Sequence, residues 1–250
     1  QFDAVVNNGF AAQLDVPGFN YKPRRFVEAY EKLPQNIILG SETASTVSSR
    51  GVYHLPSEKG VHGIDALLGA YMRHPDHQSS SYDTDYCPWS NIPDTDFAAD
   101  EDYPWMPGQF VWTGFDYLGE PTPYDTDSWP NHSSVFGIID LASIPKDRFW
   151  LYRSQWRKDS PTLHLVPHWT WPGHEGENIP VVAYSSFDKA ELFVNGVSQG
   201  IAVKAAPSGV SADPTHPAPI ASDTELMRRF RLIWPDVIYR SGELKVVAYV

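Results

Sequence analysis

The sequence is poor in cysteine, in positive charge and in long apolar runs. Its single cysteine, Cys87, excludes a framework of internal disulfides and leaves the redox compartment open, and we expect it to be a small buried apolar residue. No stretch reaches the roughly 20 apolar residues of a membrane-spanning helix, so we expect no membrane partner. A net charge of −12 repels phosphate backbones, which argues against nucleic acid as a partner.

Large aromatic residues are abundant instead: nine tryptophans, and aromatics at 14% of 250 residues. Tryptophan and tyrosine rings stack on the apolar faces of sugars, so the composition is compatible with carbohydrate binding. A core built from large aromatics explains it equally well. The N-terminus resembles the middle of a folded protein, and the C-terminal VVAYV stops within a predicted strand, so we expect a piece of a longer chain.

The first part of the chain repeats a strand-then-helix pattern. Short apolar runs that predict strands cover Leu14–Tyr21, Asn36–Glu42 and Gly108–Tyr117. Apolar residues at helical spacing follow at Phe26, Val27, Tyr30 and Leu33, at residues 64–72, and at residues 146–156. Repeated β/α units indicate parallel strands covered by helices, in an open sheet or a barrel.

The pattern changes to a period of two from about Pro161 onward. Alternating apolar residues predict strands around Leu163, around Ala190, across Phe230, Leu232 and Trp234, and from Leu244 to the end. Asn195-Gly196 predicts a tight hairpin, and residues 205–222 a surface loop. The chain is therefore expected to be α/β followed by all-β, with a first domain at 1–158 and a β-sandwich at 159–250.

Polar and aromatic residues gather where the three predicted parallel strands end: Asn20-Tyr21, Ser41-Glu42, and Trp112 with Asp116. The βα loops of barrels converge at that face and build active sites there. A carboxylate at the end of an apolar strand is costly unless it is paired or used. The pattern alone leaves two interpretations of Glu42 open: a catalytic group, or a structural residue that caps a loop or pairs with an arginine such as Arg50.

Several ordered motifs resemble one enzyme family over nearly the whole chain. GFNYKP, ILGSETAS, VWTGFDYLGEPTPY and FGIIDLASIPKD are similar to the latter half of the catalytic barrel of glycoside hydrolase family 2, particularly its β-galactosidases. HWTWPGHEGE, AELFVNG and GELKVVAY resemble the immunoglobulin-like domain that often follows this barrel. The resemblance implies a partial (β/α)8 TIM barrel, about strands 6 to 8, followed by an immunoglobulin-like sandwich.

The resemblance also implies roles for individual residues. Glu42 matches the catalytic nucleophile, and Tyr21 matches the tyrosine whose hydroxyl contacts it. Trp112 resembles the sugar platform, although a packed tryptophan is the alternative. We expect Asn20, Asp116 and Glu120 to contact the substrate, and for Asp116 and Glu120 capping of the loop remains equally open.

The implied reaction is hydrolysis of terminal β-galactosyl residues by double displacement. The second carboxyl group should be the Glu of an Asn-Glu pair, and no such pair occurs in these 250 residues. The acid/base is therefore expected upstream, and this chain alone should be inactive. The Asn-x-Lys element of β-glucuronidases has no counterpart at Ser134-Val135-Phe136, which favours a neutral sugar. β-Mannosidase, β-glucuronidase and a non-catalytic carbohydrate-binding or scaffold protein are the alternatives.

Other features carry weaker expectations. His74 and His77 near Asp83 and Asp85 lack a recognised ligand spacing, so we expect no transition-metal site and no required cofactor, with a loosely held Mg or Na ion left open. Alternation places Trp169 and Trp171 on one side of a strand, as a contact between the two domains would need. The expected partners are a glycoside and the upstream barrel and sugar-binding-like domains, and a homo-oligomer stays open. A periplasmic or secreted location is favoured over the cytoplasm.

Overall fold

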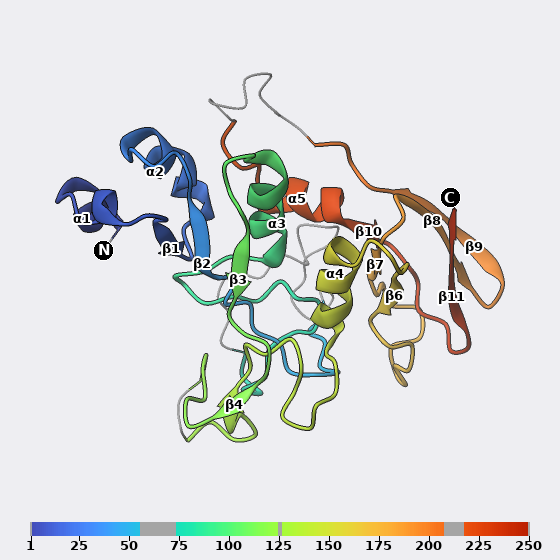
Figure 1. The fold of residues 1–250 in the computed structure, drawn as a ribbon. Helices are drawn as coiled ribbons and strands as arrows, with labels where there is room; N and C mark the ends of the chain where they lie inside the picture. The colour runs from blue at the N-terminus through green and yellow to red at the C-terminus, as the bar shows by residue number, and fades with distance from the viewer. Residues whose placement is uncertain (1, 56–73, 125–126, 208–217, 250) are drawn as a thin grey trace.

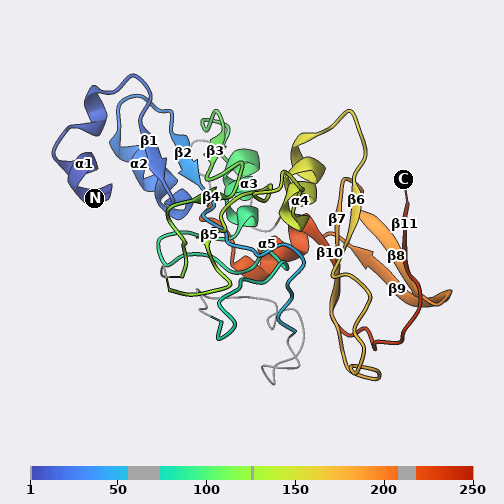
Figure 2. The same ribbon diagram turned by 90° about the horizontal axis from the view of Figure 1, so that it is seen from below.

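A computed structural model describes residues 2–55, 74–124, 127–207 and 218–249. Three parallel strands come first and two antiparallel sheets follow (Figure 1). Viewed from two directions at right angles, helices α3, α4 and α5 lie between the parallel strands and the antiparallel sheets (Figures 1 and 2). The helices are α1 (Phe2–Asn7), α2 (Phe26–Lys32), α3 (Pro93–Asp102), α4 (Asp147–Trp156) and α5 (Asp223–Phe230), with 3-10 turns at Ala11–Gln13 and Pro23–Arg25.

The parallel sheet has the order β1-β2-β3 and consists of β1 (Gly18–Asn20), β2 (Leu39–Thr43) and β3 (Gln109–Val111). The strands expected from the sequence exist, but they are shorter. Leu14 and Val16 lie in bends with their side chains exposed, so the first strand begins only after Pro17. The third strand ends at Val111, and Tyr117 belongs to a separate two-residue strand, β4 (Tyr117–Leu118), which pairs with β5 (Ser133–Ser134).

This sheet confirms the α/β part of the predicted fold, without a closed barrel among the residues described. Strands β1 and β3 are its two edges. Helices α2 and α4 lie where the apolar spacing predicts them, whereas the expected helix at residues 64–72 falls outside the described residues. Helices α3 and α5 were not predicted by the sequence pattern. No helix in the described ranges combines the length and the apolar character needed to cross a membrane.

The described residues after 158 include helix α5, which corrects the expectation of an all-β region, and their two three-stranded antiparallel sheets share a buried cluster. Side chains from both sheets meet in it, including Val181 and Leu192. The Asn195-Gly196 hairpin is confirmed, with φ of 50° and 77° at its two residues. One sheet contains β10 (Arg231–Trp234), β7 (Val181–Ser185) and β6 (Leu163–Val166), and the other β11 (Leu244–Tyr249), β8 (Lys189–Val194) and β9 (Val197–Val203).

The structure corrects two details of the predicted strands. Phe230 is the last residue of α5 and not part of the strand that carries Leu232 and Trp234. Trp169 and Trp171 lie in a loop after β6 rather than on one face of a strand, because the strand ends at Val166 before Pro167, which has no N–H to donate. Both tryptophans nevertheless pack against the main core, as a contact between the two parts of the chain requires.

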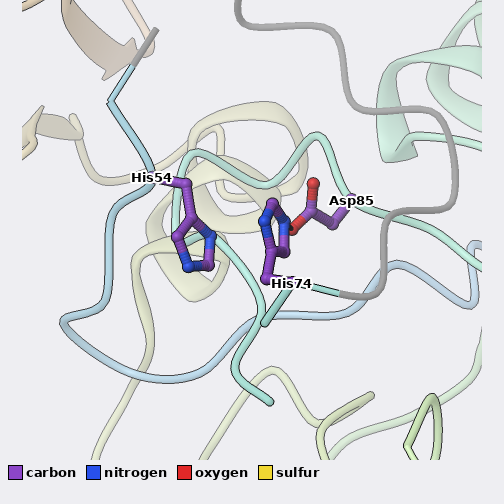
Figure 3. Close-up of side chains that lie close together, drawn as sticks. All are labelled: His54, His74 and Asp85. Atoms are coloured by element: carbon purple, nitrogen blue, oxygen red, sulfur yellow. Dashed lines mark hydrogen bonds and ion pairs between the residues drawn. The ribbon is translucent and has the colours of Figure 1, made fainter. Parts of the chain in front are cut away.

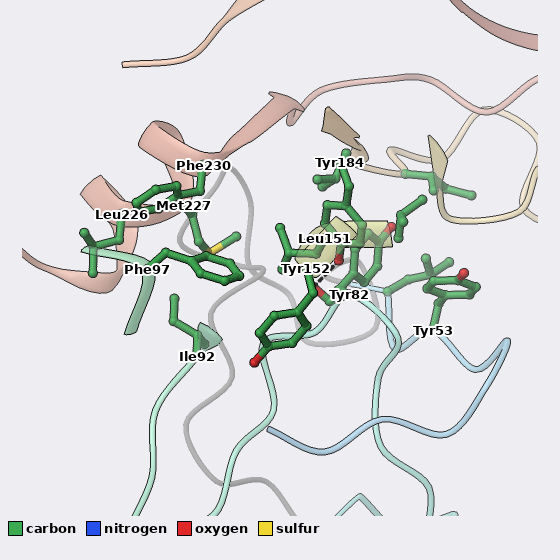
Figure 4. Close-up of a cluster of buried hydrophobic side chains, with 14 of the residues drawn as sticks. Tyr53, Tyr82, Ile92, Phe97, Leu151, Tyr152, Tyr184, Leu226, Met227 and Phe230 are labelled. Carbon is green, nitrogen blue, oxygen red and sulfur yellow. Dashed lines mark hydrogen bonds between the residues drawn. The ribbon is translucent and has the colours of Figure 1, made fainter. Parts of the chain in front are cut away.

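The main hydrophobic core crosses the boundary expected at residue 158. Leu151 of α4 and Phe97 of α3 pack there with side chains of β7 and α5 (Figure 4). The parallel-strand part and the sandwich are thus joined by one continuous core. Figure 4 labels ten of its members: Tyr53, Tyr82, Ile92, Phe97, Leu151, Tyr152, Tyr184, Leu226, Met227 and Phe230.

Candidate active site

Glu42 occupies the carboxyl end of the central parallel strand, β2. The strand on one side, β1, aligns Asn20 with Glu42, and β3 on the other side aligns Val111 with Thr43. Because parallel strands end at the same edge of a sheet, the residues that follow β1 and β3 are brought beside Glu42. The clustering of Asn20, Tyr21 and Glu42 that the sequence predicts is therefore present in the structure.

The two carboxylate oxygens of Glu42 are held by different donors. The Tyr21 hydroxyl donates to Oε1, and Asn20 Nδ2 donates to Oε2 at 3.1 Å. The orientation of the Asn20 amide is fixed in turn, since Ser41 Oγ donates to Asn20 Oδ1 at 2.9 Å. Glu42 is partly buried, so this carboxylate is oriented by two hydrogen bonds while part of its surface still faces solvent.

Tyr21 is placed to act as a permanent hydrogen-bond donor. Burial raises the pKa of its phenol well above the usual range, and the hydrogen bond to Glu42 raises it further. Its backbone lies in the left-handed region at φ 54°, which costs a non-glycine residue about 1 kcal/mol or more, and its N–H donates to the Glu42 carbonyl at 2.9 Å. The strained backbone directs the phenol back toward the end of β2.

Trp112 follows β3 directly and lies next to the residue after Glu42. Its backbone N–H donates to the Thr43 carbonyl at 2.9 Å. The indole packs against a small buried cluster that includes Cys87, and the Tyr117 ring meets it edge-on with centroids 5.9 Å apart. Trp112 remains partly exposed, so it is fixed by packing and still presents surface near Glu42. Cys87 is fully buried, as expected.

Asp116 and Glu120 differ sharply in their surroundings. Asp116 is buried, and its Oδ1 accepts hydrogen bonds from Lys146 Nζ and from the Gly137 N–H, both at 2.8 Å. Burial lowers the pKa of Lys146 to about 8, with the Asp116 charge opposing that shift. These bonds anchor the segment after β3, which favours the interpretation of Asp116 as a residue that caps its loop. Glu120 is exposed and accepts from the Tyr117 hydroxyl at 2.8 Å.

Similarity to known proteins identifies the family. Over 189 residues the chain is 40% identical to the β-galactosidase BoGH2A of Bacteroides ovatus, which covers 75% of this chain and 21% of that protein. A crystal structure of a β-glycosidase from Bacteroides vulgatus superposes with a TM-score of 0.68 at 32% identity, covering 94% of this chain and 29% of that one. The chain belongs to glycoside hydrolase family 2. It spans under a third of the length of these relatives.

Two further comparisons refine the position of the chain within family 2. A β-glucuronidase of Bacteroides fragilis is 30% identical over 98 residues, covering 39% of this chain and 14% of that protein. Residues 176–250 match a family described as a domain of unknown function, DUF4982. The family-2 relatives thus include proteins named for galactosides and for glucuronides.

The structure removes one ion pair considered for Glu42 in this family-2 chain. Arg50 forms its ion pair with Asp140, so the alternative in which Arg50 neutralises Glu42 is wrong. Asp140 also accepts from the backbone N–H groups of Ala142 and Ile144, both at 2.9 Å, and so holds its own loop together. Among the described residues, the hydrogen-bond donors to the Glu42 carboxylate are the neutral side chains of Asn20 and Tyr21.

Sequence reasoning missed two supporting residues of the site. Ser41 precedes Glu42 and fixes the amide of Asn20, and Tyr117 links the Trp112 ring to Glu120. The sequence places Ser41 beside Glu42 among the polar residues at the strand ends but does not reveal its bond to Asn20, which depends on the pairing of β1 with β2. No sequence signal identifies Tyr117, since its contact depends on the chain turning after Val111.

Proposed function

We propose that Glu42 is the nucleophile of a retaining exo-β-glycosidase in the full-length protein. The observation that carries this proposal is the carboxylate of Glu42 at the end of β2, with Tyr21 on one oxygen and Asn20 on the other. The two donors, one on each oxygen, restrict rotation of the carboxylate and fix the direction in which it points. Such a group is suited to attack an anomeric carbon.

The reaction proceeds in two displacements. In the first, a Glu42 oxygen bonds to the anomeric carbon as the glycosidic bond breaks, and a carboxylic acid protonates the departing oxygen. In the second, that same group deprotonates a water, which attacks the anomeric carbon and releases Glu42. Retention requires the two carboxyl groups about 5 Å apart. The absence of an Asn-Glu pair in this chain assigns the acid/base to a segment outside it.

The rest of the site supplies binding and shape. The partly exposed indole of Trp112 offers an apolar platform for the face of a sugar ring, with Tyr117 packed against its edge. The exposed Glu120 carboxylate is available to hydroxyl groups, and Asn20 keeps one amide hydrogen beyond that donated to Glu42. The parallel strands β1, β2 and β3 would be the last three strands of a barrel, and the two antiparallel sheets an immunoglobulin-like domain.

The substrate is a terminal β-galactoside in this proposal. Support comes from the extent of similarity to the β-galactosidase of Bacteroides ovatus and from Ser134, Val135 and Phe136 standing where β-glucuronidases carry Asn-x-Lys. A buried lysine would be needed there to bind a uronate carboxylate, and the nearby Lys146 is already engaged by Asp116 and the Ser48 carbonyl. A loosely held Mg or Na ion and an exported location complete the proposal.

The test is trapping of the glycosyl-enzyme in the full-length protein with a 2-fluoro-β-galactoside, followed by peptide mass spectrometry. We expect the label on the peptide that contains Glu42 and no label in Glu42→Gln. Glu31→Gln, an exposed glutamate on α2, is the matched control and should label like the wild type.

Three outcomes would contradict separate parts of the proposal. Labelling of another peptide by an active enzyme would refute the assignment of Glu42. Labelling of Glu42 by a 2-fluoro-glucuronide but not by the galactoside would keep the nucleophile and overturn the sugar. If the intact protein hydrolysed no glycoside and was labelled by none of the 2-fluoro sugars, the non-catalytic carbohydrate-binding alternative would be favoured.

A further inference from the structure

Three potential metal ligands meet in the loops beyond β2. His54, His74 and Asp85 each offer a ligand atom, and these atoms lie within 4.8 Å of one another (Figure 3). The imidazoles of His54 and His74 are stacked with centroids 3.6 Å apart, and His74 Nε2 lies 2.9 Å from Asp85 Oδ2. His74 and Asp85 are buried and His54 is nearly so, which separates this cluster from ordinary surface histidines.

Two polar atoms of the cluster are buried without a hydrogen-bond partner. They are His54 Nδ1 and Asp85 Oδ1. Leaving a buried polar atom unsatisfied costs about 1–3 kcal/mol, so native proteins rarely retain such atoms without a use for them. Unpartnered buried atoms also occur elsewhere among the described residues, but these two lie on members of one potential ligand cluster, where each atom can supply an electron pair to an ion.

We propose that His54, His74 and Asp85 bind a divalent transition-metal ion of the zinc class. Two imidazoles and one carboxylate are a donor set that suits Zn²⁺, Ni²⁺ or Cu²⁺, whereas Mg²⁺ and Ca²⁺ prefer oxygen ligands. The ion would engage the unpartnered atoms of His54 and Asp85. This site is separate from Glu42 and does not depend on the proposed glycosidase activity.

Binding requires a small rearrangement of the rings. The lone pair of an imidazole nitrogen lies in the plane of its ring, and the two stacked ring planes here differ by only 18°. One ion cannot lie in both ring planes until a ring turns about its χ2 torsion. Bonds of about 2.0–2.2 Å also require the ligand atoms to approach by about 1 Å. The ring of His54 lies closer to solvent than that of His74, and its Nε2 is bonded to the exposed Asp76, so it is the ring that can turn.

The surrounding contacts are of the kind that orient metal ligands. Asp76 lies 3.0 Å from His54 Nε2, and the Ser80 N–H donates to Asp85 Oδ2 at 2.8 Å. Hydrogen bonds to the ligating groups fix their orientation and commonly change metal affinity by 10- to 100-fold. The other two residues considered as metal ligands from the sequence contact different partners: His77 Nδ1 lies 3.2 Å from the Trp129 carbonyl oxygen, and Asp83 accepts a hydrogen bond from the Tyr184 hydroxyl. The expectation of no transition-metal site was based on His74, His77, Asp83 and Asp85, and it did not include His54.

The site is connected to the segment that follows Glu42. The Val47 N–H donates to the Asp85 carbonyl at 2.9 Å, and Thr46 forms a β-bridge with Tyr86. An ion joining Asp85 to His54 and His74 would hold residues 79–87 against the segments of both histidines, next to these backbone contacts with residues 46 and 47. Its role is therefore structural: it stabilises the loops that surround the end of β2.

The test is zinc binding by the full-length protein after removal of metals with a chelator. Isothermal titration with Zn²⁺ is compared between wild type, His54→Gln and Asp85→Asn, with His132→Ala, an exposed histidine outside the cluster, as control. We expect the wild type and the control each to bind one more Zn²⁺ per chain than His54→Gln and Asp85→Asn. If a variant still binds that ion, its affinity should be lower by about 100-fold or more. Mg²⁺ should not compete.

Circular dichroism of each variant keeps the result interpretable. His54→Gln keeps a polar side chain of similar size at a position that is less buried than Asp85, so it should fold even if Asp85→Asn does not. Equal Zn²⁺ stoichiometry and affinity in wild type and folded His54→Gln would overturn the proposal. Loss of one Zn²⁺ in His132→Ala alone would also overturn it, since the site would then lie elsewhere.

Discussion

Arg231 of β10 and Asp94 of α3, 137 residues apart in the sequence, form a fully buried ion pair. The guanidinium donates from Nε at 2.9 Å and from Nη2 at 2.5 Å to the two carboxylate oxygens. It also donates to the Tyr82 carbonyl at 2.8 Å. This network ties the antiparallel sheets to the helices beside the parallel strands, in the same region as the main core.

Removing one partner of this pair should destabilise the protein strongly. Asp94→Asn leaves the Arg231 charge buried without its counter-ion, for which we expect a loss of about 3 kcal/mol in the free energy of unfolding. Denaturant unfolding measures the loss. The exposed pair of Arg157 and Asp159 gives the control, and Asp159→Asn should unfold at the wild-type midpoint. Equal midpoints for the two variants would contradict the structural role of Arg231.

The buried carboxyl of Asp96 should make stability depend on pH. Burial raises its pKa to about 8, against a hydrogen bond from Asn91 that opposes the shift. Because the folded-state pKa lies above the unfolded value of 3.8, the folded chain holds a proton between about pH 4 and pH 8 that the unfolded chain has lost. The stabilisation is complete below pH 4 and is lost as pH rises through 8, by up to about 1.4 kcal/mol per unit.

Asp96→Asn tests this dependence, since the amide does not titrate. We expect the variant to match the wild type in acid and to become progressively more stable than it as pH rises from 4 to 8. Thermal or denaturant unfolding across that range provides the comparison. Asp83, whose pKa burial raises to about 6, contributes to both proteins and cancels in the difference. Asp100, whose charge adds to the raised pKa of Asp96, belongs to the effect that the comparison measures. Parallel stability curves would refute the assignment.

The sequence predicted the core of the candidate site because that core is local to strand ends. Asn20, Tyr21 and Glu42 each follow a short apolar run, and parallel pairing alone brings such residues together. The contact of Tyr117 with Trp112 and the meeting of His54 with His74 depend instead on long loops returning to the sheet. Period and propensity contain no information about those paths.

Helices α3 and α5 were not predicted from the sequence, and the reason differs between them. Helix α3, PDTDFAADED, has no apolar stripe, yet Asp94 and Asp96 are fully buried in it because tertiary partners surround the helix. Helix α5 has a readable start, since Ser222 and Glu225 form a capping box. The alternation that ends at Trp234 obscured it, because α5 passes directly into β10 without a turn.

Tyr21→Phe should slow catalysis without disturbing the fold. The change removes the hydroxyl that donates to Glu42 Oε1 and leaves the ring in place. A hydrogen bond to a charged group contributes about 1.5–3 kcal/mol, so we expect kcat to fall about 10- to 100-fold while KM changes little. Steady-state kinetics on an aryl galactoside measures both. Tyr30→Phe, in which the ring stacked on Trp105 is retained, should keep wild-type kcat.

Gly137 is a position where even one added methyl group should be disruptive. A Cβ there would lie 2.1 Å from the Asp116 backbone nitrogen and 2.4 Å from the Phe115 carbonyl carbon, and backbone atoms cannot move aside as a flexible side chain can. Gly137→Ala must therefore displace the segment that Asp116 anchors, for which we expect about 3 kcal/mol of destabilisation and a large loss of activity.

Gly114→Ala is the matched control for this prediction, because it adds the same methyl group to the neighbouring segment. A Cβ at Gly114 meets no atom within 4 Å, so stability should change by less than about 1 kcal/mol. Unfolding midpoints and kcat of the two variants decide the question together. If Gly137→Ala were as stable and active as Gly114→Ala, the close packing of residues 115–116 on residue 137 would be wrong. The anchoring of Asp116 by the Gly137 N–H would then fail with it, since both depend on that approach.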